Sequence, residues 1–127
     1  MTPDFTINVE PNNNLLRVTM KGFFKKEDIV RLAKERDAAH RQLTPHGSGR
    51  LSLVDIRGMN IQSQESVRLF QEVLSDPKKS SKRLAFVAST SLCRLQATRV
   101  AQGRNMRMFS TVVEARAWLL AGDDAGH

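Results

Sequence analysis

The side chains that most often bind metals or act as nucleophiles are few in this sequence. Of its three histidines, His40 lies in a stretch with helical spacing, His46 in a glycine-rich segment and His127 at the C-terminal end. No two of them have the spacing of a zinc site. Cys93 begins a predicted helix, where the helix dipole can lower a thiol pKa, but no base lies beside it. A small packed residue is the favoured interpretation, and we predict no catalytic residue, metal or cofactor.

Carboxylates and glycine loops add no enzyme signature. The glycine-rich segment 47–49 precedes a predicted strand, and no Lys-Ser or Lys-Thr follows a glycine loop, so nucleotide hydrolysis is not supported. Asp55 falls at the carboxyl end of a predicted strand, where α/β folds place their sites. A single carboxylate there more often caps the following turn. We therefore predict that the protein is not an enzyme.

Basic residues are the second chemical feature. The chain has 20 Lys and Arg against 13 Asp and Glu, a net charge of +7, and no acid occurs between Asp76 and Glu114. This half could bind an anion such as nucleic acid or a lipid headgroup, although a solvated basic face is the more common meaning. The chain has no tyrosine, so base stacking has little to work with and nucleic acid is not favoured. The candidate anion-binding residues are Lys78, Lys79, Lys82, Arg83, Arg104 and Arg107.

The first half of the chain has the pattern of a β-hairpin, a helix and a strand. Apolar residues alternate with polar ones over 5–9 and again over 16–20, with Pro11 and three asparagines between them. Helical spacing follows from Lys25 to Leu43. Leu51–Ile56 is short and apolar, which predicts a central strand, and the segment 57–60 is predicted to turn the chain.

The second half alternates helices with strands. Ser63 is a predicted N-cap, strands are predicted over 84–88 and 106–109 with a helix over 91–102 between them, and Thr111 with Glu114 matches a capping box. The order β-β-α-β-α-β-α-β-α predicts an α/β fold with a mixed, mainly parallel five-stranded sheet. We expect one core from residues of the central strands and covering helices: Leu53, Val54, Phe70, Phe86, Val87, Met108 and Trp118.

Length and composition indicate the number of domains and the cellular compartment. The 127 residues are enough for one domain, which we place at 1–121, followed by a flexible tail over 122–127. The single cysteine allows no intramolecular disulfide, which favours a reducing compartment. The N-terminal residues lack the basic and apolar segments of a signal peptide or membrane span. We expect a cytoplasmic protein.

Two segments carry a resemblance to a known family. Leu53–Met59 followed by Ile61-Gln62-Ser63 is similar to the third strand and following turn of STAS domains. Met106–Phe109 followed by Glu114–Leu119 looks like the closing strand and helix of STAS/SEC14-like bacterial proteins. The chain thus resembles the SpoIIAA-like (STAS) group over residues 5–121, closest to the STAS/SEC14-like proteins. The alternative is a small α/β domain of another kind, which needs similar elements.

The resemblance implies a binding or regulatory module whose partner is a protein or a small apolar, lipid-like ligand. In anti-sigma factor antagonists of this group, an Asp-Ser-Ser-Gly motif carries the phosphorylated serine, and Ser63-Gln64-Glu65-Ser66 stands at the matching positions. Glu65 occupies the acceptor place and cannot accept a phosphate, so the usual switch is predicted to be absent. Asp55, Arg57, Ser63 and Glu65 are the candidate residues of a partner or ligand edge.

Overall fold

The sheet begins with a hairpin whose two strands differ in what they bury. The computed structural model describes residues 3–43, 50–75, 82–102 and 104–121, and in it β1 (Asp4–Glu10) pairs antiparallel with β2 (Leu15–Gly22). A 3₁₀ turn over Pro11–Asn13 joins them, and Asn14 closes it with φ 51°, a left-handed conformation that asparagine tolerates. The hairpin predicted from the alternation is confirmed.

The remaining strands add to β2 in chain order, each parallel to the one before. The sheet order is β1-β2-β3-β4-β5, and every step after β2 crosses over through one helix. The predicted element order and the mixed, mainly parallel sheet are confirmed. The elements after β2 are α1 (Lys26–His40), β3 (Leu51–Met59), α2 (Gln64–Ser75), β4 (Arg83–Val87), α3 (Ser91–Val100), β5 (Met106–Phe109) and α4 (Val112–Leu120).

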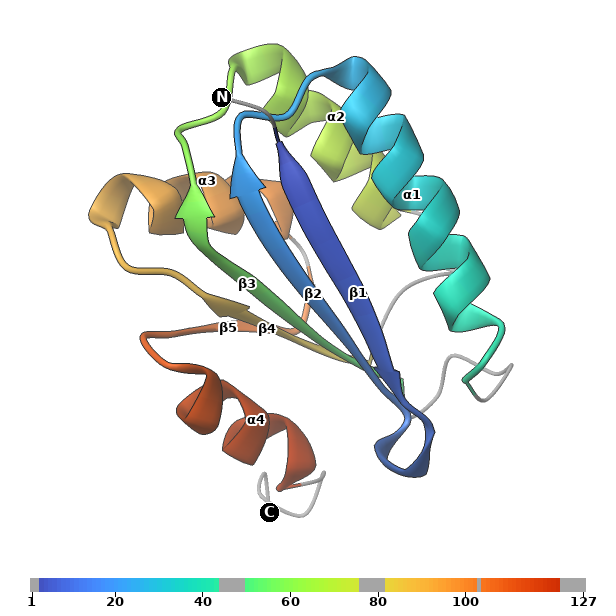
Figure 1. Ribbon diagram of the computed structural model, residues 1–127. Coiled ribbons are helices and arrows are strands. Elements are labelled where there is room, and N and C mark those ends of the chain that lie inside the picture. Colours follow the sequence, from blue (N-terminus) through green and yellow to red (C-terminus); the bar gives the residue numbers. More distant parts are fainter. Residues whose placement is uncertain (1–2, 44–49, 76–81, 103, 122–127) are drawn as a thin grey trace.

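The helices are divided unequally between the faces of the sheet. Figure 1 shows α1, α2 and α3 on one face and α4 alone on the other. The larger hydrophobic cluster, around Phe24, Phe70 and Phe86, lies under the three helices. A smaller one around Leu53, Val87 and Leu119 lies under α4.

This division corrects the prediction of a single core. Phe70, Phe86 and Met108, with Val54 beside them, belong to the larger cluster, whereas Leu53, Val87 and Trp118 belong to the smaller one. Successive side chains of a strand point to opposite faces, so neighbours such as Phe86 and Val87 are separated by the sheet.

Element ends are well defined by caps and by strand pairing. Ser63 Oγ accepts the Ser66 N–H (3.0 Å), which confirms the predicted N-cap, and Thr111 Oγ1 accepts the Glu114 N–H (3.2 Å), one of the two bonds of the predicted capping box. The turn predicted after Ile56 is wrong, because β3 continues to Met59 and pairs there with the end of β2 after a register shift.

The predicted tail over 122–127 lies outside the described residues. Among the helices that are described, none is long and apolar enough to cross a membrane.

Candidate functional site

The loops that follow β2 and β3 meet at the carboxyl edge of the sheet through one buried amide. Gln62 Oε1 accepts the Phe24 N–H at 2.8 Å, and its Nε2 donates to the carbonyls of Gly22 (3.0 Å) and Asn60 (2.5 Å). A buried backbone group without a partner costs free energy comparable to a lost hydrogen bond. The Gln62 side chain therefore fixes both loops against each other.

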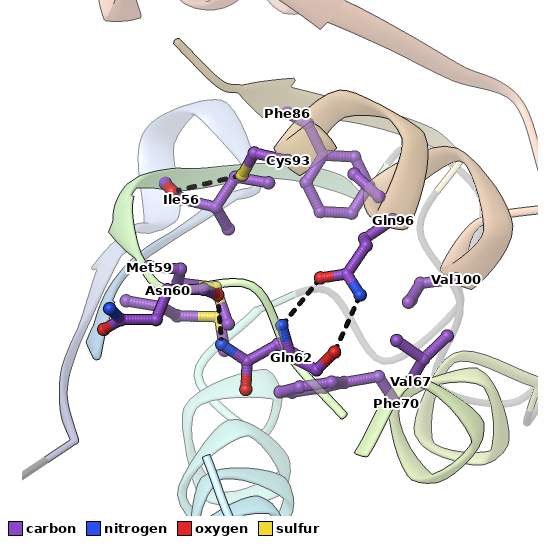
Figure 2. Close-up of a pocket in the computed structure, with 12 residues that line it drawn as sticks. Ile56, Met59, Asn60, Gln62, Val67, Phe70, Phe86, Cys93, Gln96 and Val100 are labelled. Carbon is purple, nitrogen blue, oxygen red and sulfur yellow. Dashed lines mark hydrogen bonds between the residues drawn. The ribbon is translucent and has the colours of Figure 1, made fainter. Parts of the chain in front are cut away.

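A second glutamine joins this loop to α3. The Gln96 side chain accepts the Gln62 N–H and donates to the Gln62 carbonyl, both at 2.8 Å, so the amide pairs with the backbone as a neighbouring strand would. Figure 2 shows the two residues facing each other at the rim of a pocket. The position of α3 beside the β3–α2 loop thus depends on specific hydrogen bonds as well as on packing.

The start of α2 contains a small serine network. The Ser66 hydroxyl donates to the Phe24 carbonyl at 2.6 Å, and Ser63 Oγ lies 3.1 Å from Ser66 Oγ. Ser66 is only 3% exposed, whereas Ser63 and Glu65 are exposed. Of the two serines near the predicted acceptor position, one is buried and bonded and the other is the helix cap.

An apolar pocket lies between α2 and α3 beside this network (Figure 2). Its volume is about 60 Å³, well below the roughly 150 Å³ cavity that accepts benzene. It therefore has room for one apolar side chain and is too small for an acyl chain. The lining comes from β2, β3, β4, the β3–α2 loop, α2 and α3: Met20, Ile56, Met59, Asn60, Gln62, Val67, Phe70, Phe86, Cys93, Gln96, Ala97 and Val100.

Large apolar side chains are exposed next to the lining residues. Leu92 and Leu95 on α3 are 60% and 61% exposed, and Ile61 in the β3–α2 loop is 47% exposed. On α3, Leu92 is one helical turn before the lining residue Gln96, and Leu95 is one turn after Leu92, so both lie on the side of the helix next to Gln96. Ile61 precedes the lining residue Gln62 in the β3–α2 loop. We call the pocket and these neighbouring exposed side chains the α2–α3 surface.

Cys93 is held as a thiol within the pocket wall. Its Sγ donates to the Ile56 carbonyl at 3.5 Å, and burial raises the pKa of the thiol. A raised pKa keeps the group protonated near neutral pH and lowers its reactivity. The geometry agrees with the interpretation of Cys93 as a packed residue.

The candidate partner edge is divided between two places. Asp55 and Arg57 form an ion pair at 2.8 Å on the side of the sheet that carries α4, whereas Ser63 and Glu65 begin α2 on the opposite side. Burial raises the pKa of Asp55, but hydrogen bonds from Arg57 outweigh it and the net pKa is lowered. The Asp55 carboxylate also accepts the Arg57 N–H at 3.1 Å, so it does hold the chain that follows it.

Two of the candidate anion-binding residues converge on an indole ring. The Arg83 guanidinium lies 4.2 Å from the centre of the Trp118 ring and donates to the Leu119 carbonyl at 3.3 Å. Arg107 lies over the same ring at 5.8 Å. Arg83 is buried and therefore has a structural role in holding α4 on the sheet.

The other candidate cations are spread more widely. Lys82 is exposed, and Arg104 is half-buried at the turn after α3, where burial lowers the pKa of its guanidinium. Lys78 and Lys79 lie outside the described residues. In the part of the chain that is described, no group of three or more His, Cys, Asp or Glu side chains could hold a metal ion.

Comparison with solved structures decides the fold. An uncharacterized protein of the DUF3478 family with a SpoIIAA-like fold, from Shewanella loihica PV-4, matches with a TM-score of 0.72 and 20% identity, over 94% of this chain and 96% of that chain. The fold is SpoIIAA-like. An anti-sigma factor antagonist from Mycobacterium paratuberculosis matches with a TM-score of 0.61 and 12% identity, over 91% and 94% of the two chains. The resemblance predicted from the two sequence segments is confirmed at the level of the fold.

Sequence comparisons add no closer relative. No protein-family model matches the chain, and no curated protein matches it significantly. Sequence reasoning did not single out the α3 side of the α2–α3 surface. A signal was present, because α3 carries apolar residues at 92, 93, 95, 97 and 100, more than one helix face can bury.

Proposed function

We propose that this protein is a non-enzymatic regulatory module that binds a protein partner through the α2–α3 surface, without a phosphoserine switch. The observation that carries the proposal is the apolar pocket flanked by the exposed side chains of Ile61, Leu92 and Leu95. Protein interfaces gain most of their affinity where an anchor side chain fills a desolvated pocket ringed by other contacts. The fold shared with an anti-sigma factor antagonist supports a regulatory role, as an analogy of fold.

The pocket volume favours a protein over a small apolar ligand as partner. Ligand pockets bury most of a ligand's surface, and an acyl chain needs far more space than about 60 Å³. One leucine or methionine side chain of a partner fits this size better. The thioethers of Met20 and Met59 in the lining can adjust to different apolar anchors.

The first turn of α2 supports the absence of the switch. Glu65 is exposed there, where the helix dipole favours a negative charge. It stands at the position that matches the phosphoacceptor and provides one permanent charge. A partner that recognises this edge would encounter the same charge at all times.

Affinity capture with matched variants tests the proposal. The parent chain, a Leu92→Asp/Leu95→Asp variant and a Val113→Asp control are immobilised and exposed to an extract of the cells that produce the protein. Val113 is 78% exposed on α4, so its substitution adds a charge on the opposite face. The bound material is analysed for protein and, after extraction, for lipid.

We expect one protein to be retained by the parent and the Val113→Asp control and lost by the double variant. The isolated partner then binds the purified parent in calorimetry, and the double variant at least about tenfold more weakly. Retention of the partner by all three chains, or a stoichiometric lipid in place of a protein, would contradict the proposal.

A further inference from the structure

The outer faces of α3 and α2 determine which charges border the pocket. On α3, residues 93, 96, 97 and 100 line the pocket, while Leu92, Leu95 and Arg99 follow the i, i+3, i+7 spacing of the neighbouring outer face. Arg99 is exposed, and no acidic residue occurs on α3. The α3 side of the pocket is therefore apolar and cationic.

The α2 side carries charges of both signs, with Arg68 nearer to α3 than the two glutamates. Val67 and Phe70 line the pocket, and Gln71 Nε2 donates to the Arg99 carbonyl at 2.9 Å, which shows that this stripe of α2 faces α3. Arg68 is exposed one residue beyond Val67. At about 100° per residue, Glu65 and Glu72 lie further round the helix from the α3-facing stripe than Arg68 does.

Resting on the proposed function, we infer that the α2–α3 surface binds a short acidic segment of its protein partner. The segment inserts one apolar side chain into the pocket, packs further apolar residues against Leu92 and Leu95, and places carboxylates against Arg68 and Arg99. Complementary charge at the rim of an interface sets partner choice and the rate of association. An amphipathic segment in a groove between helices is a common recognition mode.

The charges also argue against a second copy of this chain as the occupant. A two-fold interface through this surface would place the patch that carries Arg68 and Arg99 against the same patch of the other copy. The net charge of +7 adds a general repulsion between copies. Binding of an acidic partner avoids both sources of electrostatic repulsion.

A displayed library of random 12-residue peptides, selected on the immobilised parent chain, tests the inference. Recovered peptides are synthesised, and their affinities are measured for the parent, for Arg68→Glu/Arg99→Glu and for a control, Lys26→Glu/Lys34→Glu. The control makes the same change of charge at exposed positions on α1. Circular dichroism verifies folding, and Arg68→Gln/Arg99→Gln replaces the first variant if it fails to fold.

We expect the recovered peptides to share one large apolar residue and several acids, and to bind the Arg68→Glu/Arg99→Glu variant at least about tenfold more weakly than the parent. The control should stay within about twofold of the parent. Peptides without acids that are lost on Leu92→Asp/Leu95→Asp would overturn this inference and leave the proposed function intact.

Other outcomes count against both proposals. Peptides that bind the Arg68→Glu/Arg99→Glu and Leu92→Asp/Leu95→Asp variants as well as the parent, or a selection that recovers no binding peptide, would overturn both. A concentration-dependent dimer of the parent in sedimentation, lost on Leu92→Asp/Leu95→Asp, would make a second copy the occupant.

Discussion

The two faces of the sheet are held by different means. Under α1, α2 and α3, three phenylalanine rings meet, with Phe24 centred 6.4 Å from Phe5 and 5.9 Å from Phe70. On the other face α4 packs on β3, β4 and β5, with Trp118 against Phe109 at 5.7 Å and Arg83 over the indole. The three-helix face thus has the larger apolar core, with one cation–π contact from Arg31 to Phe5 (5.0 Å), and the α4 face combines a smaller core with contacts from two arginines to Trp118.

This difference favours the three-helix face as the place of a binding surface. On the α4 side, the paired positions of β1 and β2 hold polar residues, Thr6 opposite Thr19 and Asn8 opposite Arg17. The salt bridge from Arg116 to Glu10 (2.6 Å) joins α4 to the end of the hairpin. The α2–α3 surface lies on the better packed face, and a rigid scaffold lowers the entropic cost of ordering a binding site.

The largest expected effect is on the three-helix face. Phe86 is 5% exposed within the larger cluster. Phe86→Ala should lower the free energy of unfolding by about 3 to 5 kcal/mol, because it removes a buried ring and leaves a cavity. Chemical denaturation measures the change. A melting temperature within about one degree of the parent would show that this face does not depend on apolar burial.

A smaller loss is expected on the α4 face. Trp118 is half-buried, and its ring contacts Phe109 and two guanidinium groups. Trp118→Ala should cost about 2 kcal/mol, below the range for fully buried rings. Val113→Ala on the exposed side of α4 is the control and should change stability by less than about 0.5 kcal/mol. A loss for Trp118→Ala as large as that of Phe86→Ala would remove the distinction between the faces.

The ionic part of the α4 face predicts a pH dependence. The hydrogen bond from Arg116 holds the pKa of Glu10 below its ordinary value of 4.5. The salt bridge therefore stabilises the fold above about that pH, and the contribution is lost as pH falls through the lower folded pKa. Glu10→Gln should cost at most about 1 kcal/mol at pH 7 and less at pH 3. Urea midpoints of the parent and of Glu10→Gln at the two pH values measure this.

Binding of anions by the basic half should be weak. Arg83 and Arg107 contact Trp118, so part of the predicted site already takes part in the packing of α4. We expect binding of DNA or anionic vesicles at low salt that vanishes near physiological ionic strength. Sub-micromolar binding that persists at physiological salt and is lost on Lys78→Ala/Lys79→Ala/Lys82→Ala would favour an anion-binding function. Arg83 is left intact in this variant because it is buried.

No phosphorylation is expected at the start of α2. Ser66 is buried and donates to Phe24, Ser63 caps the helix, and Glu65 stands at the acceptor position. An anti-sigma-type kinase should therefore add no phosphate to this chain, while a natural antagonist substrate in the same reaction serves as the positive control. Stoichiometric phosphate on Ser63 or Ser66 by mass spectrometry would restore the switch.

Much of the architecture followed from local patterns. Period-two alternation located the hairpin, and Ser63 and Thr111 marked two helix starts, because caps act over three residues. The end of β3 was misplaced since Arg57-Gly58-Met59 has the composition of a turn. Its pairing with Lys21 and Gly22 depends on residues distant in the sequence.

The site was less accessible to sequence reasoning. Gln62 and Gln96 are 34 positions apart, and they are hydrogen-bonded only because α3 lies beside the β3–α2 loop. Conversely, Asp55 and Ser63 are close in sequence but lie on opposite sides of the sheet. Side-chain proximity within a sequence segment does not predict proximity at a surface.

The sequence by itself determined the class of fold, the absence of an enzyme signature and the charge of the second half, since these depend on composition and on spacing within single elements. Only the tertiary structure decided which residues share a core and which surround the pocket. The physical reason is that a sheet separates neighbours in sequence and packed helices join residues far apart. The spacing of apolar residues predicts that a side chain is buried, but the packing of helices on the sheet decides which residues it is buried against.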